Sequence, residues 1–158
     1  VYDYRIYKDG DKGSWEKNCQ QKAVVLRDAL DTIDGPIVCI DSDAHFQEYP
    51  HLFNELRCDF AYYYFSRTRE YLSGTLYLAN NNRVRAFVDQ WIHENSRNDR
   101  WDQVNMKNVL LSDRSLQTKR LPVEYCKIFD NKYQECSNPV VVHGQMSRKA
   151  KRQRMGRT

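Results

Sequence analysis

Hydrophobic residues recur at helical spacing in three segments of the chain. These segments are residues 14–30, 83–95 and 101–111, the last with the least regular spacing. In the first segment, Ala23, Leu26 and Leu30 share one helical face, and Ser14 is in position to cap the first turn. The pattern predicts three amphipathic helices, each with one face turned to a core.

Short apolar runs bounded by turn residues lie between these segments. The runs that predict β-strands are residues 37–40, 59–65, 75–79, 121–123 and 140–142, and residues 1–7 are a further candidate strand. The turn sequence Asp34-Gly35-Pro36 breaks the chain before the first of the central runs. Buried strands that alternate with helices are typical of the α/β class. We therefore expect a three-layer α/β/α sandwich with a mostly parallel mixed sheet.

Chain length and hydropathy favour one globular domain. A membrane-spanning helix needs about 20 mostly apolar residues, whereas runs such as Ile37–Ile40 have four. The N-terminus also lacks the apolar stretch of a signal peptide. With 158 residues, 41% of them hydrophobic, the chain is long enough for one globular catalytic domain, which we expect over residues 1–147.

The positive charge is concentrated at the C-terminus. Residues 148–158 carry six Lys or Arg and no acid, so the first 147 residues have a net charge of −2 out of a total of +4. An acidic body argues against a nucleic-acid-binding domain. Nucleic acid is therefore a possible partner only through the basic tail, which has no aromatic residue for base stacking.

The cysteine pattern favours a reducing compartment. The chain has five cysteines, an odd number, and none of them is in a CxxC pair. This argues against a disulfide scaffold and against a structural zinc site. We expect a cytoplasmic protein with thiol side chains.

The strongest local signal for chemistry is a pair of carboxylates at a strand end. Asp41 and Asp43 follow directly after the apolar run Ile37–Ile40. In open α/β sheets, ligands bind beyond the carboxyl ends of strands, and two close carboxylates favour a bound cation such as Mg²⁺ or Mn²⁺. The alternative is a solvated turn, in which Asp is common.

Two further features are weaker when taken singly. Asp102 lies at the start of the third predicted helix, where a carboxylate also stabilises the helix dipole without any catalytic role. His143 follows the last apolar run, where an imidazole can bind a metal but more often is an ordinary structural residue.

Taken in order along the chain, these segments resemble one enzyme family. The segments WEKNCQQKA, IVCIDSDAHF, SGTLYLANN, WDQVNM and VVHGQMSRKAK, from about Trp15 to Lys151, resemble the nucleotide-diphospho-sugar transferases of GT-A fold. The DxD pattern alone is a weak motif, but the ordered set is more specific. The resemblance implies a Rossmann-like GT-A domain and a metal-dependent glycosyltransferase that moves a sugar from a nucleotide-diphospho-sugar donor to an unknown acceptor.

The resemblance also implies roles for individual residues. Asp41, Asp43 and His143 match the ligands of Mn²⁺ or Mg²⁺, with Asp43 as a direct ligand and Asp41 near the ribose or the metal. The residues that match donor-binding positions are Lys22, Ser73, Gly74, Thr75, Ser147 and Lys149. Asp102 and Gln103 match the catalytic helix start, where Asp102 would act as a general base or orient the sugar.

Two aspects of the resemblance stay open. A GT-A domain usually begins with a nucleotide-binding half ahead of the segment that matches Trp15, and only 14 residues precede Trp15 here. We therefore expect that half to be minimal or truncated. The stereochemical course is also undecided: Asp102 suits inversion as a base, whereas the Asp-Gln-plus-Asn helix start slightly favours retention.

Two other functions fit parts of the pattern. A haloacid dehalogenase-like phosphohydrolase also has DxD after an apolar strand, but His45 stands where Thr or Val is usual and no later pair of adjacent Asp residues follows a strand. A non-catalytic module that binds a nucleotide sugar or another anion is the second alternative.

An aromatic run could contribute to ligand binding. Tyr62, Tyr63, Tyr64 and Phe65 should alternate between the two faces of a strand, so core packing accounts for half of them and the others could stack on a sugar. Arg67 and Arg69 follow this strand and are interpreted as surface charges that could also reach an anion.

Overall fold

The computed structural model describes residues 10–144. The chain divides into two compact units, one formed by the residues up to Ile37 together with Ala79–Gln117, the other by Val38–Leu78 together with the residues from Thr118. Each unit is described by itself. The candidate strand at residues 1–7, the donor-binding candidates Ser147 and Lys149, and the basic tail lie outside the described residues.

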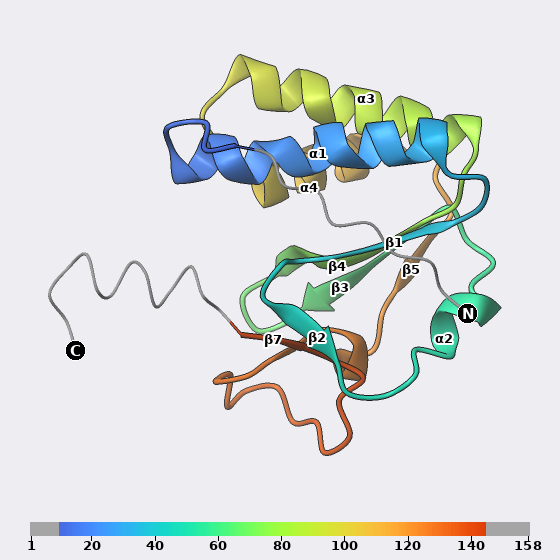
Figure 1. Cartoon of the computed structure of the whole chain (residues 1–158), viewed down its shortest axis with the longest axis vertical. Coiled ribbons are helices and arrows are strands. Elements are labelled where there is room, and N and C mark those ends of the chain that lie inside the picture. The colour runs from blue at the N-terminus through green and yellow to red at the C-terminus, as the bar shows by residue number, and fades with distance from the viewer. Residues whose placement is uncertain (1–9, 145–158) are drawn as a thin grey trace, which may run out of the picture. The chain divides into compact units, whose positions relative to one another are not determined.

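The first unit contains three helices that pack on one another. They are α1 (Trp15–Thr32), α3 (Asn82–Arg97) and α4 (Asp102–Ser112), and Figure 1 shows them side by side. The buried side chains of these helices are mostly apolar: Ala23, Leu26, Ala29, Leu30, Val84, Phe87, Val88, Trp91, Met106, Val109 and Leu110. The three helices predicted from apolar periodicity are confirmed, with ends that differ by at most two residues.

Side-chain caps fix where two of these helices begin. The Ser14 hydroxyl accepts a hydrogen bond from the Lys17 amide, as expected for an N-cap. Asn81 does the same for α3, because its side-chain oxygen accepts from the Val84 amide at 3.0 Å. Both caps satisfy backbone N–H groups that the first helical turn leaves without a partner.

The second unit contains two small sheets. One has the strand order β1 (Ile37–Ile40), β4 (Glu70–Leu78), β3 (Phe60–Phe65) and β5 (Thr118–Arg120). The other has the order β2 (Ala44–Phe46), β7 (Val141–His143) and β6 (Lys127–Ile128). A short helix α2 (Leu52–Glu55) and a 3₁₀ turn η1 (Val123–Tyr125) complete the described elements of this unit.

The sheets are mixed rather than mostly parallel. The longest described pairing, between β3 and β4, is antiparallel, as is the pairing of β2 with β7. The pairings of β3 with β5 and of β6 with β7 are parallel. The chain is therefore a mixed α/β protein, which confirms the expected class, while the strand directions depart from the expected largely parallel sheet.

One predicted strand was wrong and five short elements were not predicted. Residues 121–123 do not form a strand: β5 ends at Arg120, and Pro122 caps the 3₁₀ turn η1. The reason is that proline has no N–H to donate to a strand neighbour. The unpredicted elements each have four residues or fewer: β2, α2, β5, η1 and β6. The strand expected at residues 75–79 begins earlier, at Glu70.

The aromatic strand β3 does not alternate regularly. Its pairing with β4 shifts in register between Tyr62 and Tyr63, so Tyr62 lies opposite Leu76 and Tyr63 opposite Leu72. Tyr62 is buried, whereas Tyr63 and Tyr64 are partly exposed. A bulge of this kind breaks the two-residue period on which the sequence argument relied.

Within the described residues, no helix has the length and apolar character needed to cross a membrane.

Charged side chains join α1 to α3. The Arg27 guanidinium pairs with Asp31 on its own helix and with Asp89 of α3, the latter at 2.7 Å. The Arg85 Nε atom lies 3.7 Å from the Asp31 carboxylate, so this carboxylate has a cation from each helix. The hydrogen bond from Arg27 is the main cause of the lowered pKa of Asp31, and the positive charges of both arginines add to it.

Replacing this carboxylate should reduce stability in a pH-dependent way. Because the pKa of Asp31 in the folded chain lies below its ordinary value of 3.8, its contribution to stability is present above that value and is lost as the pH falls through the lowered pKa. We expect Asp31→Asn to be less stable than the unmodified protein at pH 7, and the difference to shrink below about pH 4. Denaturant unfolding at a series of pH values measures this.

The matched control is Asp28→Asn, which removes an exposed carboxylate of the same helix for which the described part of the chain gives no ion pair. It should unfold like the unmodified protein at every pH. An equal effect of both substitutions, or an Asp31→Asn effect that does not change with pH, would contradict the role of the ion pairs.

Candidate metal centre

The two carboxylates of the DxD sequence lie in a tight turn after β1. The Asp41 amide still donates to the Gly74 carbonyl of the neighbouring strand β4, at 2.9 Å. The Ala44 amide then donates back to the Asp41 carbonyl, also at 2.9 Å, which closes the turn before β2. The prediction that Asp41 and Asp43 follow the end of a strand is confirmed.

His143 reaches this turn through the pairing of β2 with β7. Ala44 lies opposite His143 in the antiparallel register, and the Gly144 amide donates to the Asp43 carbonyl at 2.9 Å. His143 is the last residue of β7 and its side chain is 5% exposed. Backbone pairing, rather than the side chains themselves, therefore brings the histidine beside the carboxylates.

One carboxylate oxygen each of Asp41 and Asp43 and one ring nitrogen of His143 lie within 4.8 Å of one another. The two carboxylates are partly exposed and the imidazole is buried. We call these three residues the metal group. Two carboxylates and one imidazole are a chemically suitable ligand set for a divalent cation, and their close approach would otherwise be repulsive for the two carboxylates.

Thr75 is hydrogen-bonded to the imidazole of His143. Its hydroxyl oxygen lies 2.8 Å from His143 Nε2, and Thr75 is fully buried in β4. If Nδ1 carries no proton and is open to a cation, Nε2 carries the proton and donates it to this hydroxyl. A hydrogen bond to the second ring nitrogen is the usual way in which a protein orients a histidine ligand.

Gly74 leaves the space that the ring occupies. A Cβ atom at this position would lie 2.8 Å from His143 Cε1, 3.1 Å from His143 Nδ1 and 3.2 Å from Asp41 Oδ2. The contact with Cε1 is shorter than a side chain tolerates, and the buried imidazole is not a flexible end that can move away. The same distances place Nδ1 and the Asp41 carboxylate around one point beside Gly74.

The donor-binding candidates on β4 differ in accessibility. Ser73 and Thr75 are 5% and 0% exposed, whereas Gly74 between them is partly exposed. Any contact of these residues with a ligand would therefore involve the backbone at Gly74, as the resemblance implies, while the Thr75 hydroxyl is occupied by His143. Their role towards a donor stays a prediction.

The remaining candidates belong to the helical unit. Lys22 on α1 lies near Asp102 at the start of α4, with Lys22 Nζ 4.0 Å from Asp102 Oδ2. Asp102 is 3% exposed, and its carbonyl accepts a hydrogen bond from the Trp91 indole at 3.0 Å. Gln103 follows it and is partly exposed. Lys22 and Asp102 were predicted separately, and the pairing of their charges was not.

Sequence reasoning missed a buried amide cluster beside Asp102. The Asn105 side chain is fully buried, and its Nδ2 donates to Asn95 Oδ1 at 2.9 Å and to Asn98 Oδ1 at 3.1 Å. These bonds join the end of α3 to the first turn of α4, and so they position that turn. The available signal was a polar residue three positions after Asp102, on the same helical face.

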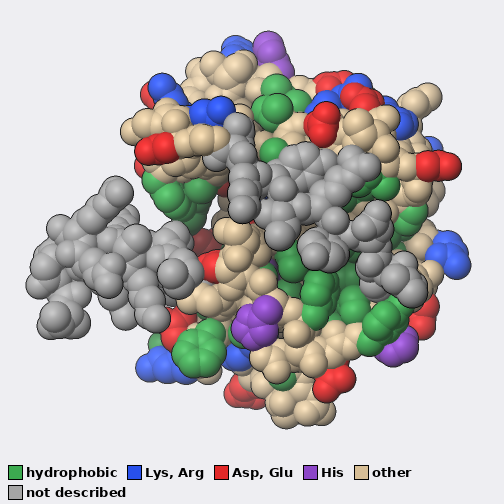
Figure 2. Space-filling view, viewed as in Figure 1, with side chains coloured by type: hydrophobic (Ala, Val, Ile, Leu, Met, Phe, Trp, Pro, Cys, Tyr) green, Lys and Arg blue, Asp and Glu red, His purple; other side chains and the backbone are tan. Residues whose placement is uncertain are grey.

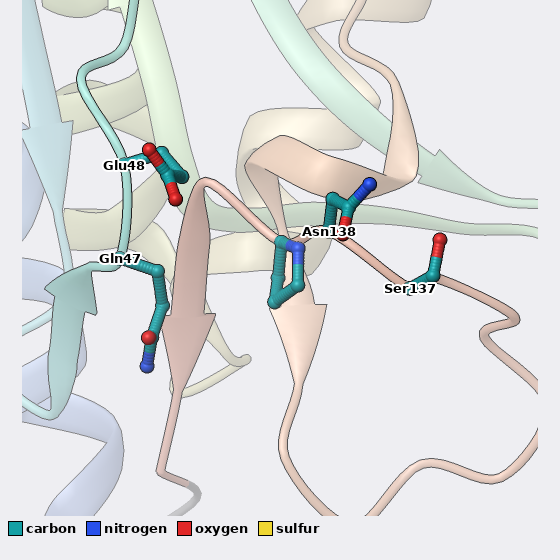
Figure 3. A pocket seen from close by; sticks show the side chains of 5 residues that line it. Gln47, Glu48, Ser137 and Asn138 are labelled. Carbon is teal, nitrogen blue, oxygen red and sulfur yellow. The ribbon is translucent and has the colours of Figure 1, made fainter.

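A separate pocket in the second unit contains none of the predicted residues. It has a volume of about 460 Å³ and is lined by Gln47, Glu48, Ser137, Asn138 and Pro139 (Figure 3). The Gln47 amide donates to the Val140 carbonyl at 2.9 Å, which joins the two lining segments. We assign no function to this pocket.

No family model matches the chain, and no curated protein matches it. The arrangement of the side chains and the order of the motifs are therefore the basis for any functional proposal.

The space at Gly74 can be tested by filling it. We expect Gly74→Ala to destabilise the fold by about 1–3 kcal/mol, because the added methyl group overlaps the His143 ring and a packed interior yields little. Denaturant unfolding measures the loss, and NMR of the imidazole resonances shows whether His143 moves. Gly10→Ala is the control, because a Cβ there meets nothing within 4 Å. Unchanged stability and unchanged His143 resonances in Gly74→Ala would contradict the close approach.

Proposed function

We propose that this chain is a metal-dependent glycosyltransferase of GT-A fold, with a Rossmann-like three-layer domain, that moves a sugar from a nucleotide-diphospho-sugar donor to an acceptor. The observation that carries the proposal is the metal group, because Asp41, Asp43 and His143 come from distant parts of the sequence and converge within 4.8 Å. Support also comes from the order of the motifs, in which the DxD turn, the Ser-Gly strand, the Trp-Asp-Gln helix and a late histidine follow one another.

The ligand set favours Mn²⁺ or Mg²⁺ as the cofactor. Carboxylate oxygens suit both ions, and the imidazole nitrogen suits Mn²⁺ better than the harder Mg²⁺. When bound, such an ion supplies positive charge that stabilises the departing nucleoside diphosphate. Asp43 and His143 would hold it directly, and Asp41 would contact it or the donor ribose.

The chain's own residues have distinct tasks in this proposal. Thr75 orients the His143 ring, and Gly74 leaves room for it beside Asp41. Asp102 would accept the proton of the acceptor hydroxyl or orient the sugar, with Gln103 beside it. Lys22, the backbone at Ser73–Thr75, and Ser147 and Lys149 would bind the donor. Lys22 Nζ lies 4.0 Å from the Asp102 carboxylate, which brings the proposed donor-binding lysine beside the proposed catalytic residue.

Titration of the full chain with Mn²⁺ and nucleotides tests the donor site. The probes are UDP, GDP and their glucose, galactose and mannose derivatives, each with and without Mn²⁺, followed by calorimetry. We expect saturable binding that requires the ion and that weakens about a hundredfold in Asp43→Asn, because a charged carboxylate ligand is replaced by a neutral amide. Glu55→Gln, which removes an exposed carboxylate of the same unit, should bind normally.

Each other outcome has a definite meaning. Normal metal-dependent binding by Asp43→Asn would contradict the metal group. Absence of binding to every probe would contradict the donor site. A metal-dependent complex with neither transfer nor hydrolysis of the donor would contradict the enzymatic function and favour the non-catalytic binding module.

The catalytic role of Asp102 is tested by turnover. With the donor identified above, we expect Asp102→Asn to reduce the rate of sugar transfer or donor hydrolysis by about a hundredfold or more, the usual effect of losing a general base. Donor affinity should stay within about threefold, because the ligands of the diphosphate are intact.

Since Asp102 is buried beside Lys22, thermal unfolding must be measured in parallel. The Gln103→Glu variant serves as a neighbouring control for folding. A normal rate in a folded Asp102→Asn variant would remove Asp102 from the catalytic residues.

A further inference from the structure

The loop that follows β6 presents two large aromatic side chains to solvent. Phe129 is 77% exposed and Tyr133 is 52% exposed. Single exposed hydrophobic residues are common on protein surfaces. Two exposed rings within five residues of one loop are less common than a single exposed ring. We call residues 129–133 the aromatic loop.

Internal hydrogen bonds fix the aromatic loop in place. The Gln134 side chain is 4% exposed; it accepts from the Ile128 amide at 2.7 Å and donates to the Cys126 carbonyl at 2.9 Å. The Lys127 ammonium donates to the carbonyls of Asn131 and Gln134, at 2.9 and 2.5 Å. A loop whose polar groups are satisfied from inside holds its outward side chains in fixed positions, which lowers the entropic cost of binding.

Positive charge is fixed beside one of the two rings. The Arg67 guanidinium carbon lies 3.8 Å from the centre of the Tyr133 ring, and Lys132 Nζ lies 5.3 Å from the same point. Arg67 is exposed and comes from the turn between β3 and β4. A guanidinium packed on a ring keeps its N–H edges available for a carboxylate, sulfate or phosphate.

The charges around the loop are otherwise balanced. Asp130 and Glu135 are exposed acids in or next to the loop. On the face seen in Figure 2, basic and acidic side chains are interspersed. Because Asp130 and Glu135 lie on either side of Lys132 and Tyr133 in the sequence, the cations at Tyr133 do not belong to a continuous basic segment. This favours a ligand with a localised anionic group over a long polyanion, which needs a continuous basic track.

The aromatic loop is attached directly to the strand that carries His143. Ile128 lies opposite His143 in the pairing of β6 with β7, and the Phe129 amide donates to the His143 carbonyl at 3.0 Å. The residue that carries the exposed Phe129 ring is thus hydrogen-bonded through its backbone to His143 of the metal group. In a transferase, a loop whose backbone is bonded to the strand of a proposed metal ligand is a suitable place for the acceptor.

We propose that Phe129, Tyr133, Arg67 and Lys132 bind an anionic saccharide acceptor. The apolar face of a sugar ring would stack on Phe129, and its carboxylate, sulfate or phosphate would bind Arg67 and Lys132. This inference rests on the proposed glycosyltransferase function, and it adds the chemical class of the acceptor.

An oligosaccharide array tests the proposal with the full chain. The array holds neutral oligosaccharides, matched oligosaccharides that carry glucuronate, sulfate or phosphate, and a single-stranded DNA 12-mer. We expect binding to at least one anionic oligosaccharide, about tenfold tighter than to its neutral counterpart, and weaker at high salt. Because the C-terminal tail is basic, only binding that depends on the four named residues counts.

Matched variants identify those residues. Phe129→Ala and Arg67→Gln should each weaken the binding about tenfold. Phe46→Ala, which removes another exposed ring of the same unit, and Arg114→Gln, which removes another exposed arginine, should leave it unchanged. An equal loss in the controls, normal binding by Phe129→Ala, a preference for neutral sugars or for DNA, or no binding at all would overturn the proposal.

The donor titration separates this inference from the proposed function. Phe129→Ala should bind Mn²⁺ and nucleotide like the unmodified chain, because its side chain is not among the metal ligands. Intact donor binding with no anionic saccharide bound would overturn the acceptor class alone. Absence of donor binding by the unmodified chain would instead overturn the proposed glycosyltransferase function.

Discussion

The antiparallel pairing of β2 with β7 is the constraint on which the metal group depends. It joins the chain just after the DxD turn to the last described strand, and the hydrogen bond from Gly144 to Asp43 continues it into the turn. Asp43 and His143 are far apart in the sequence, and this pairing is what brings them together in space. Two close carboxylates oppose such a fold unless a cation is bound, so cation binding and folding of this unit should be thermodynamically linked.

The sequence predicted the longer elements well and the shortest ones poorly. α1, α3 and α4 were predicted because each repeats its apolar face over several turns, and the cap at Ser14 follows from local chemistry. β2 and β6 have three and two residues, which is too short for any periodicity to be detected. They exist because β7 offers hydrogen-bond partners on both edges, and such tertiary pairing leaves no local signal.

The site was predictable in composition and not in its supporting contacts. Asp41 and Asp43 were indicated by their place after a buried strand, whereas the place of His143 after the last apolar run was a weak signal that only the order of motifs strengthened. The hydrogen bond between Thr75 and His143 and the pairing of Lys22 with Asp102 both join residues far apart in sequence. Such contacts depend on how strands and helices pack, and a pattern within one segment cannot contain them.

As the proposed ion site, the metal group would combine one buried ligand with two partly exposed ones. His143 is buried, with Thr75 bonded to its Nε2 and Gly74 packed against its ring, so its orientation is determined before any ion arrives. Asp41 and Asp43 are partly exposed in the turn after β1. In the proposed reaction the diphosphate must enter and leave at each turnover. A fixed imidazole would preserve the position of the ion, and the exposed carboxylates would leave that ion accessible to the diphosphate.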